Sequence, residues 1–386
     1  MIRRKKQNNF TQWFLQPFTG NRSDGHQPDF VLLGSIALLL FFGLIFLSSA
    51  SSTLGFFKYQ DTYRFVKQQI IHGLLPGLLL FYVAIRINYQ YYKKLAWLGL
   101  LGSFGLLLLV FITSLSADYS AQSWIILGNI SFQPTELVKL FLIIFLAAWF
   151  EKKGSDIKDF KKTTIPFVII ITLISFLIIK QPDIGTLSII ALTSLAIYYA
   201  AGAKLTHFFI ILAAGISGFI VMIKAAPYRM NRIVAWLNPD LDPQGIGWQI
   251  KQSLIAVGSG GWFGLGIGSS RQKSYLPQPA NDSIFAVMAE EIGFIFSIGF
   301  IILFMILIYR GFQIIKHSDD TFAKLLALGI VIWMALQIFI NIGGTIKLMP
   351  LTGVPLPFMS LGGTNLVVTL IAMGILANIS KFTHNR

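Results

Sequence analysis

Residues Tyr228 to Glu291 read YRMNRIVAWLNPDLDPQGIGWQIKQSLIAVGSGGWFGLGIGSSRQKSYLPQPANDSIFAVMAEE. This segment is rich in Gly and Pro, is polar in places, and carries much of the charge found outside the two tails. The sequence on both sides of it consists almost entirely of apolar runs. Because binding and catalytic residues concentrate in loops that a rigid scaffold positions, we look for function here first. Asp282 is the most informative residue of the segment.

The composition indicates an integral membrane protein. The chain has 386 residues, of which 55% are hydrophobic and 12% are charged. A soluble domain carries roughly 25% charged residues, about twice as many. The absence of cysteine excludes disulfides and Cys-ligated zinc or iron–sulfur sites. The net charge of +15 does not indicate nucleic-acid binding, because the basic residues are scattered between apolar runs, as the positive-inside rule predicts.

Ten apolar runs approach the length of about 20 residues that a membrane-spanning helix needs. They lie at roughly 30–50, 66–86, 95–115, 134–151, 164–180, 184–201, 206–224, 284–309, 322–344 and 363–380. We therefore predict an all-α polytopic membrane protein with about ten transmembrane helices. Most of the quoted segment, up to Ser283, falls within a long extracytoplasmic loop, 225–283, between helices 7 and 8, and its end begins helix 8.

The organisation expected from these runs is a single transmembrane domain, 30–380, between a cytoplasmic N-terminal tail, 1–29, and a cytoplasmic C-terminal tail, 381–386. The start, MIRRKKQNNF, is basic, but a long polar stretch follows it, so we expect no cleavable signal peptide. The even number of spans, with Lys and Arg concentrated on the side of the tails, predicts that both termini are cytoplasmic. This pattern predicts a multi-pass membrane protein; the family resemblance described below implies the cytoplasmic membrane of a bacterium.

The basic residues of the long loop do not follow that charge bias. They are Arg229, Arg232, Lys251, Arg271 and Lys273. Long loops often escape the positive-inside rule, so the topology stands. We expect these residues to serve another purpose, such as binding an anionic ligand or the head groups of the outer leaflet.

Charged residues within the predicted spans are costly in lipid and are functional candidates. Glu136 and Lys139 lie three residues apart on one helical face and can pair. They form either a structural ion pair at the end of a span or the polar wall of a cavity. Asp183, in the turn QPDIGT, either caps the next helix or forms a polar lip of the same cavity.

Asp282 immediately precedes an apolar run, and two readings of it are open. It either caps that helix or holds a carboxylate at the mouth of a cavity, where it can act as a general base. Glu290 and Glu291 lie two turns further on, so at least one of them must face protein or water. The glycines of 260–268 predict a close-packed backbone segment that is shielded from lipid. The five histidines show no ligand spacing, so metal ligands stay unassigned.

Five motifs give a family resemblance over nearly the whole chain. They are FQPTELVKL (132–140), QPDIGT (181–186), NPDLDPQGIGWQIKQSLIAVGSGGWFGLGIG (238–268), LPQPANDSIFAVMAEEIGF (276–294) and LTGVPLPFMSLGGTNL (351–366). In this order they resemble the SEDS family (shape, elongation, division and sporulation), whose members include FtsW, RodA and SpoVE. The NDSIFAVMAEE wording and the basic tail are slightly more similar to FtsW.

The resemblance implies a peptidoglycan glycosyltransferase that polymerises lipid II into β-1,4 glycan strands at the outer face of the membrane. Its implied partners are a class B penicillin-binding protein and other divisome or elongasome membrane proteins. By match to the motifs, Asp282 stands at the catalytic aspartate. The residues expected to bind substrate are Glu136, Lys139, Arg232, Asp183, Gln252, Ser259, Lys273, Glu290 and Ser360.

The chemistry implied is one displacement with inversion, because the donor sugar is α-linked and the product is β-linked. Asp282 would take the proton of the attacking hydroxyl. A divalent cation, Mg²⁺ or Mn²⁺, is expected to help neutralise the leaving diphosphate, and no organic cofactor is expected. The sequence departs from the family pattern at Gln278, Asn281, Ser283 and Leu361.

Two other functions are compatible with the same residues. Ten spans with charges inside them also suit a transporter, here a lipid II flippase or a transporter of a polyprenyl-linked precursor. However, the sequence shows no evident repeats, and its polar motifs cluster toward one face. A purely structural scaffold for the division machinery would leave Asp282 as a helix cap.

Overall fold

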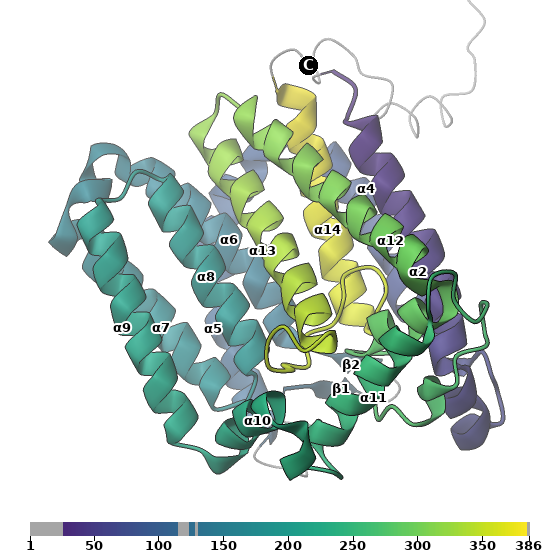
Figure 1. Ribbon diagram of the computed structural model, residues 1–386. Coiled ribbons are helices and arrows are strands. Elements are labelled where there is room, and N and C mark those ends of the chain that lie inside the picture. Colours follow the sequence, from purple (N-terminus) through teal and green to yellow (C-terminus); the bar gives the residue numbers. More distant parts are fainter. Residues whose placement is uncertain (1–25, 115–122, 128–129, 384–386) are drawn as a thin grey trace, which may run out of the picture.

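The structure is a computed structural model that describes residues 26–114, 123–127 and 130–383. Most of the two predicted tails, and residues 115–122 and 128–129 between the third and fourth predicted spans, lie outside these ranges. Within them the chain is an all-α bundle with one small hairpin (Figure 1). The hairpin pairs β1 (Ile125–Leu127) with β2 (Ile130–Phe132) in antiparallel register, with Ile126 opposite Ser131.

The α-helices are α2 (Phe30–Tyr59), α3 (Arg64–Gln69), α4 (Leu75–Arg86), α5 (Gln90–Ser114), α6 (Pro134–Lys153), α7 (Ile165–Ile179), α8 (Ile184–Ala200), α9 (Leu205–Lys224), α10 (Pro227–Leu237), α11 (Ile246–Ser259), α12 (Ile284–Lys316), α13 (Thr321–Thr345) and α14 (Gly363–Ile379). Two π-helical turns continue this list, Ile70–Leu74 between α3 and α4 and Phe160–Thr164 before α7.

The predicted membrane spans all correspond to helices. Eight helical segments of the described ranges are long and apolar enough to cross a membrane. The other two predicted spans are α8, which is shorter, and α6, which carries Glu136 and Lys139. The helices α2 and α12 continue beyond the predicted ends because helical structure does not stop where the apolar run stops. The prediction of a polytopic all-α protein is confirmed.

Local chemistry sets where several helices begin. The side chains of Asp29, Asp183 and Asp320 accept hydrogen bonds from backbone N–H groups in the first turns of α2, α8 and α13. These bonds satisfy donors that have no partner within the helix. The structure thus shows the capping role that was one of the two alternatives for Asp183.

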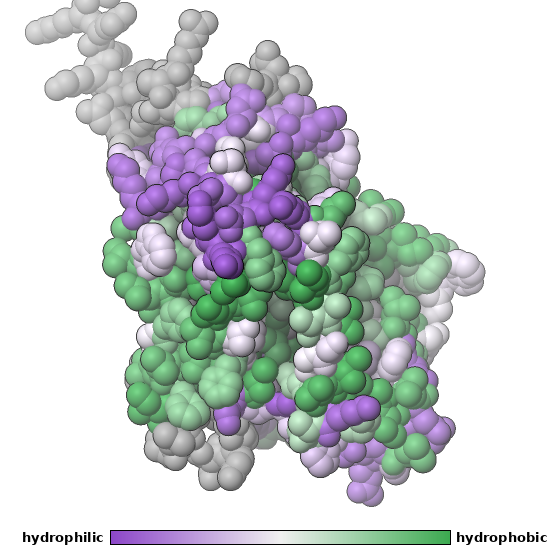
Figure 2. All heavy atoms as spheres, turned by 90° about the vertical axis from the view of Figure 1, so that its left-hand side faces the viewer, coloured by the Kyte–Doolittle hydropathy of each residue, from purple (hydrophilic) through white to green (hydrophobic). Residues whose placement is uncertain are grey.

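The bundle has a polar–apolar–polar profile along its long axis. Figure 2 shows hydrophobic side chains gathered in a broad belt, with hydrophilic ones at both ends. The helices α13 and α14 occupy its centre (Figure 1), and most of their side chains are buried. The helix α9 lies at one edge and is almost entirely exposed. Such a belt fits the hydrocarbon layer of a membrane, about 30 Å thick.

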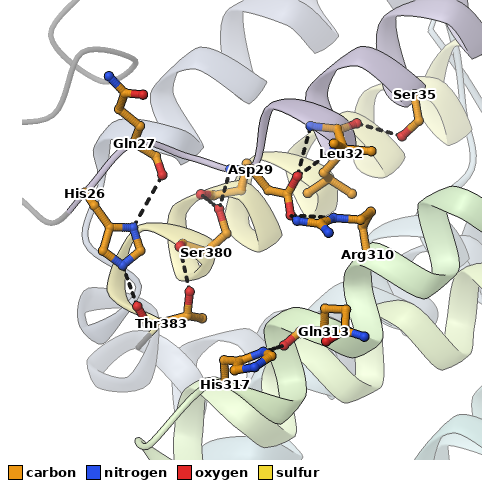
Figure 3. A network of polar contacts seen from close by, with 12 residues as sticks. His26, Gln27, Asp29, Leu32, Ser35, Arg310, Gln313, His317, Ser380 and Thr383 are labelled. Atoms are coloured by element: carbon orange, nitrogen blue, oxygen red, sulfur yellow. Dashed lines mark hydrogen bonds and ion pairs between the residues drawn. The ribbon is translucent and has the colours of Figure 1, made fainter. Parts of the chain in front are cut away.

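Both ends of the described chain lie at the same end of the bundle, which we call the terminal face. There the buried carboxylate of Asp29 accepts hydrogen bonds from Arg310 Nε at 2.8 Å and Nη2 at 2.5 Å (Figure 3). The Asp29 N–H group donates to Ser380 Oγ at 3.0 Å, and His26 N–H donates to the Lys381 carbonyl at 2.9 Å. These bonds join the start of α2, the end of α12 and the end of the chain.

The opposite end, which we call the loop face, holds the segment 225–283 (Figure 1). This segment is not an irregular loop, because it contains α10 and α11 and the short 3₁₀ turns Pro239–Leu241 and Gln272–Ser274. The amphipathic helix α10 begins with Pro227 in its first turn. The segment 346–362 also lies at this face and covers the ends of α13 and α14.

The glycine-rich stretch 260–268 packs directly on α12. At Gly293, a φ of 74° interrupts that helix and leaves backbone groups without helical partners. Four hydrogen bonds satisfy them: Leu265 N–H to Glu290 O, Gly266 N–H to Glu291 O, Phe294 N–H to Gly261 O, and Ile295 N–H to Trp262 O. A Cβ atom on Gly264 would lie 2.1 Å from the Glu291 carbonyl oxygen, so the glycines are needed for this approach. The predicted close packing is present, while the side chains of Trp262, Phe263 and Ile267 in this stretch are exposed, so its predicted shielding is not seen in the bundle alone.

Candidate functional site

The carboxylate of Asp282 is the centre of the candidate site. It lies on the loop face just before α12, whose N-cap is Ser283, and it does not cap that helix. The residue is only 9% exposed. Its Oδ2 atom accepts a hydrogen bond from Gln249 Nε2 at 3.2 Å, while Oδ1 has no hydrogen-bond partner among the described residues. A buried carboxylate oxygen without a partner is costly, so its retention points to a functional role.

The electrostatic setting of Asp282 favours a base. Burial raises the pKa of its carboxyl group above the ordinary value. Hydrogen bonds from its own backbone and from Gln249, and the positive charge of Arg232, oppose that rise. Because burial outweighs them, the ionised carboxylate binds a proton more readily than it would in water.

The backbone at Asp282 is held from α13. Asn341 Nδ2 donates to the Asp282 carbonyl at 3.0 Å, and Thr345 Oγ1 donates to the same oxygen at 3.4 Å. Asn341 Nδ2 also donates to the Val354 carbonyl at 2.8 Å, which ties the segment 346–362 to the same point. The position of the carboxylate is thus determined by α11, α12 and α13 together.

Gln249 is a site residue that the sequence analysis missed. Its Nε2 atom donates both to Asp282 and to Ser283 Oγ, each at 3.2 Å. Gln252, the residue predicted from the sequence, lies one turn further along α11, and its side chain is buried. Both glutamines lie in the motif GWQIKQS, which is helical. If this motif is taken as a helix beside Asp282, both Gln249 and Gln252 become candidates, and this is the signal in the sequence that could have identified Gln249.

Arg232 and Ser360 lie near Asp282 through the segment 346–362. Arg232 Nη1 donates to the carbonyls of Leu351 and Thr352 at 3.5 and 3.4 Å, and its charge acts on Asp282. Ser360 Oγ donates to the carbonyl of Asn281 at 2.5 Å. The structure therefore brings these two predicted residues to the candidate site.

Glu136 and Lys139 form a completely buried ion pair, with Lys139 Nζ 2.9 Å from Glu136 Oε2. Lys139 Nζ also donates to Gln337 Oε1 at 3.1 Å, and Gln337 Nε2 donates to the Pro355 carbonyl at 3.0 Å. A cavity of about 10 Å³ beside Lys139 is too small for a substrate. The pair thus lies behind the segment 346–362 and supports it, and it does not touch Asp282.

A second polar cluster forms around Glu290, about 12 Å further along α12 by helical rise. The buried Glu290 carboxylate accepts hydrogen bonds from four groups: Ser270 Oγ at 2.5 Å, Arg271 N–H at 3.2 Å, Gln272 N–H at 3.2 Å and Ser259 Oγ at 3.3 Å. Its lone pairs are therefore engaged in holding the chain at 270–272. Glu290 and Ser259 are positioned as structural groups, away from the carboxylate of Asp282.

Lys273 and Glu291 complete this second cluster. Ser49 Oγ donates to Glu291 Oε1, and Lys273 Nζ lies 3.4 Å from the same hydroxyl. Lys273 Nζ also donates to the Gly268 carbonyl at 2.8 Å. Both Glu290 and Glu291 are buried in protein, as the cost of a charge in lipid requires.

The departures from the family pattern are mutually compatible. Asn281 Nδ2 donates to Gln278 Oε1 at 3.0 Å, so these two amides pair with each other. Ser283 accepts from Gln249, and Leu361 N–H donates to the Ala280 carbonyl at 2.8 Å. A leucine side chain at 361 leaves that backbone bond in place.

The donor set at Asp282 does not fit a resident divalent cation. Mg²⁺ and Mn²⁺ prefer several oxygen ligands, whereas this single carboxylate accepts an N–H group of Gln249 and lies within reach of the positive charge of Arg232. No group of three or more His, Asp or Glu residues in the part of the chain that the structure describes is arranged to hold a metal ion.

The fold and the site together define a polytopic membrane protein with a buried carboxylate at one face of the bundle. A family model described as "Cell cycle protein", for FtsW, RodA and SpoVE, matches residues 30–385. The chain belongs to this family. The family resemblance inferred from the five motifs is thereby confirmed.

Relatives and solved structures agree with this assignment. The chain is 39% identical to the stage V sporulation protein E of Bacillus subtilis over 92% of its length and 98% of the relative's. It is 38% identical to a probable peptidoglycan glycosyltransferase FtsW of Trichlorobacter lovleyi, over 91% and 93%.

Two solved structures share the fold. A chain from a peptidoglycan synthase complex, described for the coordination of polymerisation and crosslinking, matches with a TM-score of 0.76 at 23% identity, over 93% of this chain and 99% of that one. The rod shape determining protein RodA of Thermus thermophilus matches with a TM-score of 0.66 at 22% identity, over 93% and 98%.

Proposed function

We propose that the chain is a peptidoglycan glycosyltransferase that polymerises lipid II, with Asp282 as the general base. The observation that carries this proposal is the buried Asp282 carboxylate. Its Oδ1 atom has no hydrogen-bond partner among the residues that the structure describes, while Oδ2 and the Asp282 carbonyl are both held. Curated relatives of similar length bear the name of this activity. A fixed carboxylate with one free oxygen is the arrangement that a general base needs.

The reaction is a single displacement at the anomeric carbon of the donor. The acceptor 4-hydroxyl attacks that carbon, its proton passes to Asp282 Oδ1, and the bond from the carbon to the diphosphate breaks with inversion. Proton transfer to a positioned carboxylate contributes roughly 10²–10⁴-fold to the rate. Arg232, whose charge reaches Asp282, is placed to stabilise the negative charge that develops on the departing diphosphate.

The loop face is proposed to lie outside the cytoplasmic membrane, with both termini in the cytoplasm. The basic segments on the terminal side support this orientation by the positive-inside rule. Lipid II then reaches Asp282 from the outer leaflet. A class B penicillin-binding protein is the proposed partner, supported by the likeness to a chain of a synthase complex that couples polymerisation to crosslinking.

Polymerisation by the purified protein tests the proposal. The chain, reconstituted in nanodiscs with its class B penicillin-binding protein, lipid II and Mg²⁺ or Mn²⁺, is expected to make glycan polymer that a gel resolves. Asp282→Asn and Asp282→Ala are expected to make none. Asp240→Asn is the matched control, because Asp240 is an exposed aspartate of the same segment that pairs with Lys251.

The outcomes separate the alternatives. Polymer from Asp282→Ala at the rate of the unmodified chain would remove Asp282 as the base. Movement of lipid II across the membrane of vesicles without polymer would identify a flippase. If neither activity were found, the result would favour a purely structural scaffold. Addition of EDTA tests the divalent cation that the family resemblance implies, although the residues at Asp282 do not form a resident site for it; unchanged polymerisation would contradict that implication.

A further inference from the structure

A groove of about 500 Å³ opens on the side of the bundle between α2 and the chain that follows α11. It is separate from Asp282, which does not line it. Its lining comes from α2, from the turn after α2 and from the glycine-rich stretch with its continuation: Phe41, Leu44, Ile45, Ser48, Ser49, Ser52, Thr62, Tyr63, Ile267, Gly268 and Lys273.

The lining changes character along α2. Phe41, Leu44 and Ile45 form its apolar part, and Ser48, Ser49 and Ser52 follow toward the loop face. Ser48 lies about 27 Å from Phe30, the first residue of α2, by helical rise. The hydrocarbon layer of a bilayer is about 30 Å thick, so the hydroxyl groups lie where that layer meets the head groups. The groove therefore has the polarity profile of a single lipid molecule.

One cation lies at the polar end of the groove. Lys273 Nζ contacts the Gly268 carbonyl and the Ser49 hydroxyl, and it forms no ion pair within the described ranges. An ammonium group has three N–H donors, so one stays available for a ligand. Glu291 lies on the far side of Ser49, buried in protein. Its Oε1 atom accepts from the hydroxyl of Ser49 and the N–H of Ser270, and its Oε2 atom is buried without a hydrogen-bond partner among the described residues.

The groove is open to the surrounding membrane. Phe41 is 60% exposed and Ile267 is 63% exposed, although both lie in the apolar belt or at its edge. A ligand held here would lie among the lipids that surround the bundle, so the bilayer itself is the source that the geometry favours. A phosphate beside Lys273 and the hydroxyls of the groove would receive charge-assisted hydrogen bonds, which are the strong ones.

We infer that this groove is a binding site for one anionic phospholipid of the leaflet at the loop face. Its phosphate is held by Lys273 and the hydroxyl of Ser48, and one acyl chain lies along Phe41 and Ile45. The Ser52 hydroxyl lines the groove but already donates to the Ser49 carbonyl. The site is independent of the proposed glycosyl transfer, since no atom of it belongs to the Asp282 site. It assigns a role to Lys273, a basic residue on the loop face that the reaction does not use.

Photo-crosslinking in nanodiscs tests the site. The full chain is reconstituted in phosphatidylcholine with a small fraction of phosphatidylglycerol that carries a diazirine on one acyl chain, and the crosslinked peptides are mapped. Crosslinks are expected to concentrate on 41–52 of α2. Unlabelled phosphatidylglycerol is expected to compete, while neutral diacylglycerol is not. Lys273→Gln is expected to weaken the competition constant roughly 10-fold, because it removes a charge-assisted hydrogen bond.

Three further variants make the result decisive. Lys224→Gln removes a lysine at the end of α9, which also lies toward the loop face but at the opposite edge of the bundle from α2. It is expected to leave the crosslinks and the competition constant unchanged. Ser48→Phe fills the groove without touching Lys273 and is expected to abolish the crosslinks on α2. Asp282→Asn is expected to crosslink like the unmodified chain, so a failed glycosyltransferase proposal would leave this test intact.

Several outcomes would overturn the inference. Crosslinks spread evenly over the apolar belt would show only a lipid annulus. Equal competition by diacylglycerol, or an unchanged constant for Lys273→Gln in a chain whose apparent Tm is unaltered, would remove the phosphate contact. Stronger displacement by a polyprenyl phosphate than by phosphatidylglycerol would make the occupant a carrier lipid instead of a bilayer phospholipid.

Discussion

The burial of Asp282 on the loop face changes the pKa of its carboxyl group and lowers the stability of the folded chain. The carboxyl group of Asp282 is ionised less readily than an ordinary aspartate because burial removes water from its charged form. The unfolded chain does not bear this penalty. The buried Asp282 carboxylate therefore lowers the stability of the folded state, a cost that is common at active sites.

Asp282→Asn is therefore expected to stabilise the fold at neutral pH while it abolishes polymerisation. Because the folded pKa is raised, the unmodified chain loses stability as pH rises from the unfolded value, about 3.9, through the folded value. The variant lacks this loss. We expect a gain near pH 7 of about 0.5–2 kcal/mol, the usual range for stabilising replacements, that disappears toward pH 4. Apparent Tm values against pH measure it, and an equal difference at all pH values would contradict the assignment.

Gln249→Leu tests how the carboxylate is positioned. The hydrogen bond from Gln249 favours the ionised form of Asp282, so its loss raises the pKa of that group further. The acid limb of the rate profile is expected to move to higher pH, and kcat is expected to fall roughly 10-fold with little change in KM. Gln244→Leu, in an exposed glutamine of the same segment, is the control. A fall in activity with an unmoved pH profile would indicate a merely structural role.

At the scale of elements, the interruption of α12 at Gly293 organises the second polar cluster. The break exposes the carbonyls of Glu290 and Glu291 to the glycine-rich stretch, and it lets that stretch cross the helix at backbone contact. The Glu290 side chain then fixes the chain at 270–272, from which residues 273–282 run back to the start of α12. The glycines thus help to position the segment 273–282, which leads to Asp282.

Gly293→Ala is expected to destabilise this arrangement. The residue has a φ of 74°, and a Cβ atom would lie 2.2 Å from the Gly264 nitrogen. The backbone strain alone costs about 1–3 kcal/mol, and the clash adds to it. Gly299→Ala is the matched control on the same helix, because nothing lies within 4 Å of its added Cβ, and it is expected to be neutral or to stabilise by up to about 1 kcal/mol. Apparent Tm values compare the two. Equal values would show that the crossing is not required.

For the whole molecule, both described ends of the chain meet at one face, and the candidate site lies at the other. The Asp29–Arg310 ion pair and the bond from Asp29 to Ser380 hold the terminal face together (Figure 3). The apolar belt separates the two faces (Figure 2). The proposed orientation therefore places all of the glycosyl-transfer chemistry on one side of the membrane.

Single cysteines decide this orientation, since the native chain has none. Gln244→Cys lies on the loop face and is expected to react with a membrane-impermeant maleimide in intact cells. Lys316→Cys, at the end of α12 on the terminal face, is expected to react only after permeabilisation. Labelling of the Lys316→Cys chain in intact cells would invert the proposed topology and with it the site of polymerisation.

The sequence by itself determined the helices and the family. An apolar run of about 20 residues must span lipid as a helix whatever its neighbours are, because its backbone has no other hydrogen-bond partner there. The ten predicted spans are accordingly present as helices. The five motifs identify the family by residue order alone, without any knowledge of contacts.

Only the tertiary structure decided what each polar residue does. The readings left open for Asp183, Glu136 and Asp282 depend on partners that lie far away in the chain. The structure makes Asp183 a cap and buries Glu136 in an ion pair. Within the described part of the chain it leaves one Asp282 oxygen without a hydrogen-bond partner. Gln249 was missed because it meets Asp282 across 33 residues. The chemistry of a carboxylate is set by burial and by nearby donors, and both arise only when separate helices pack together.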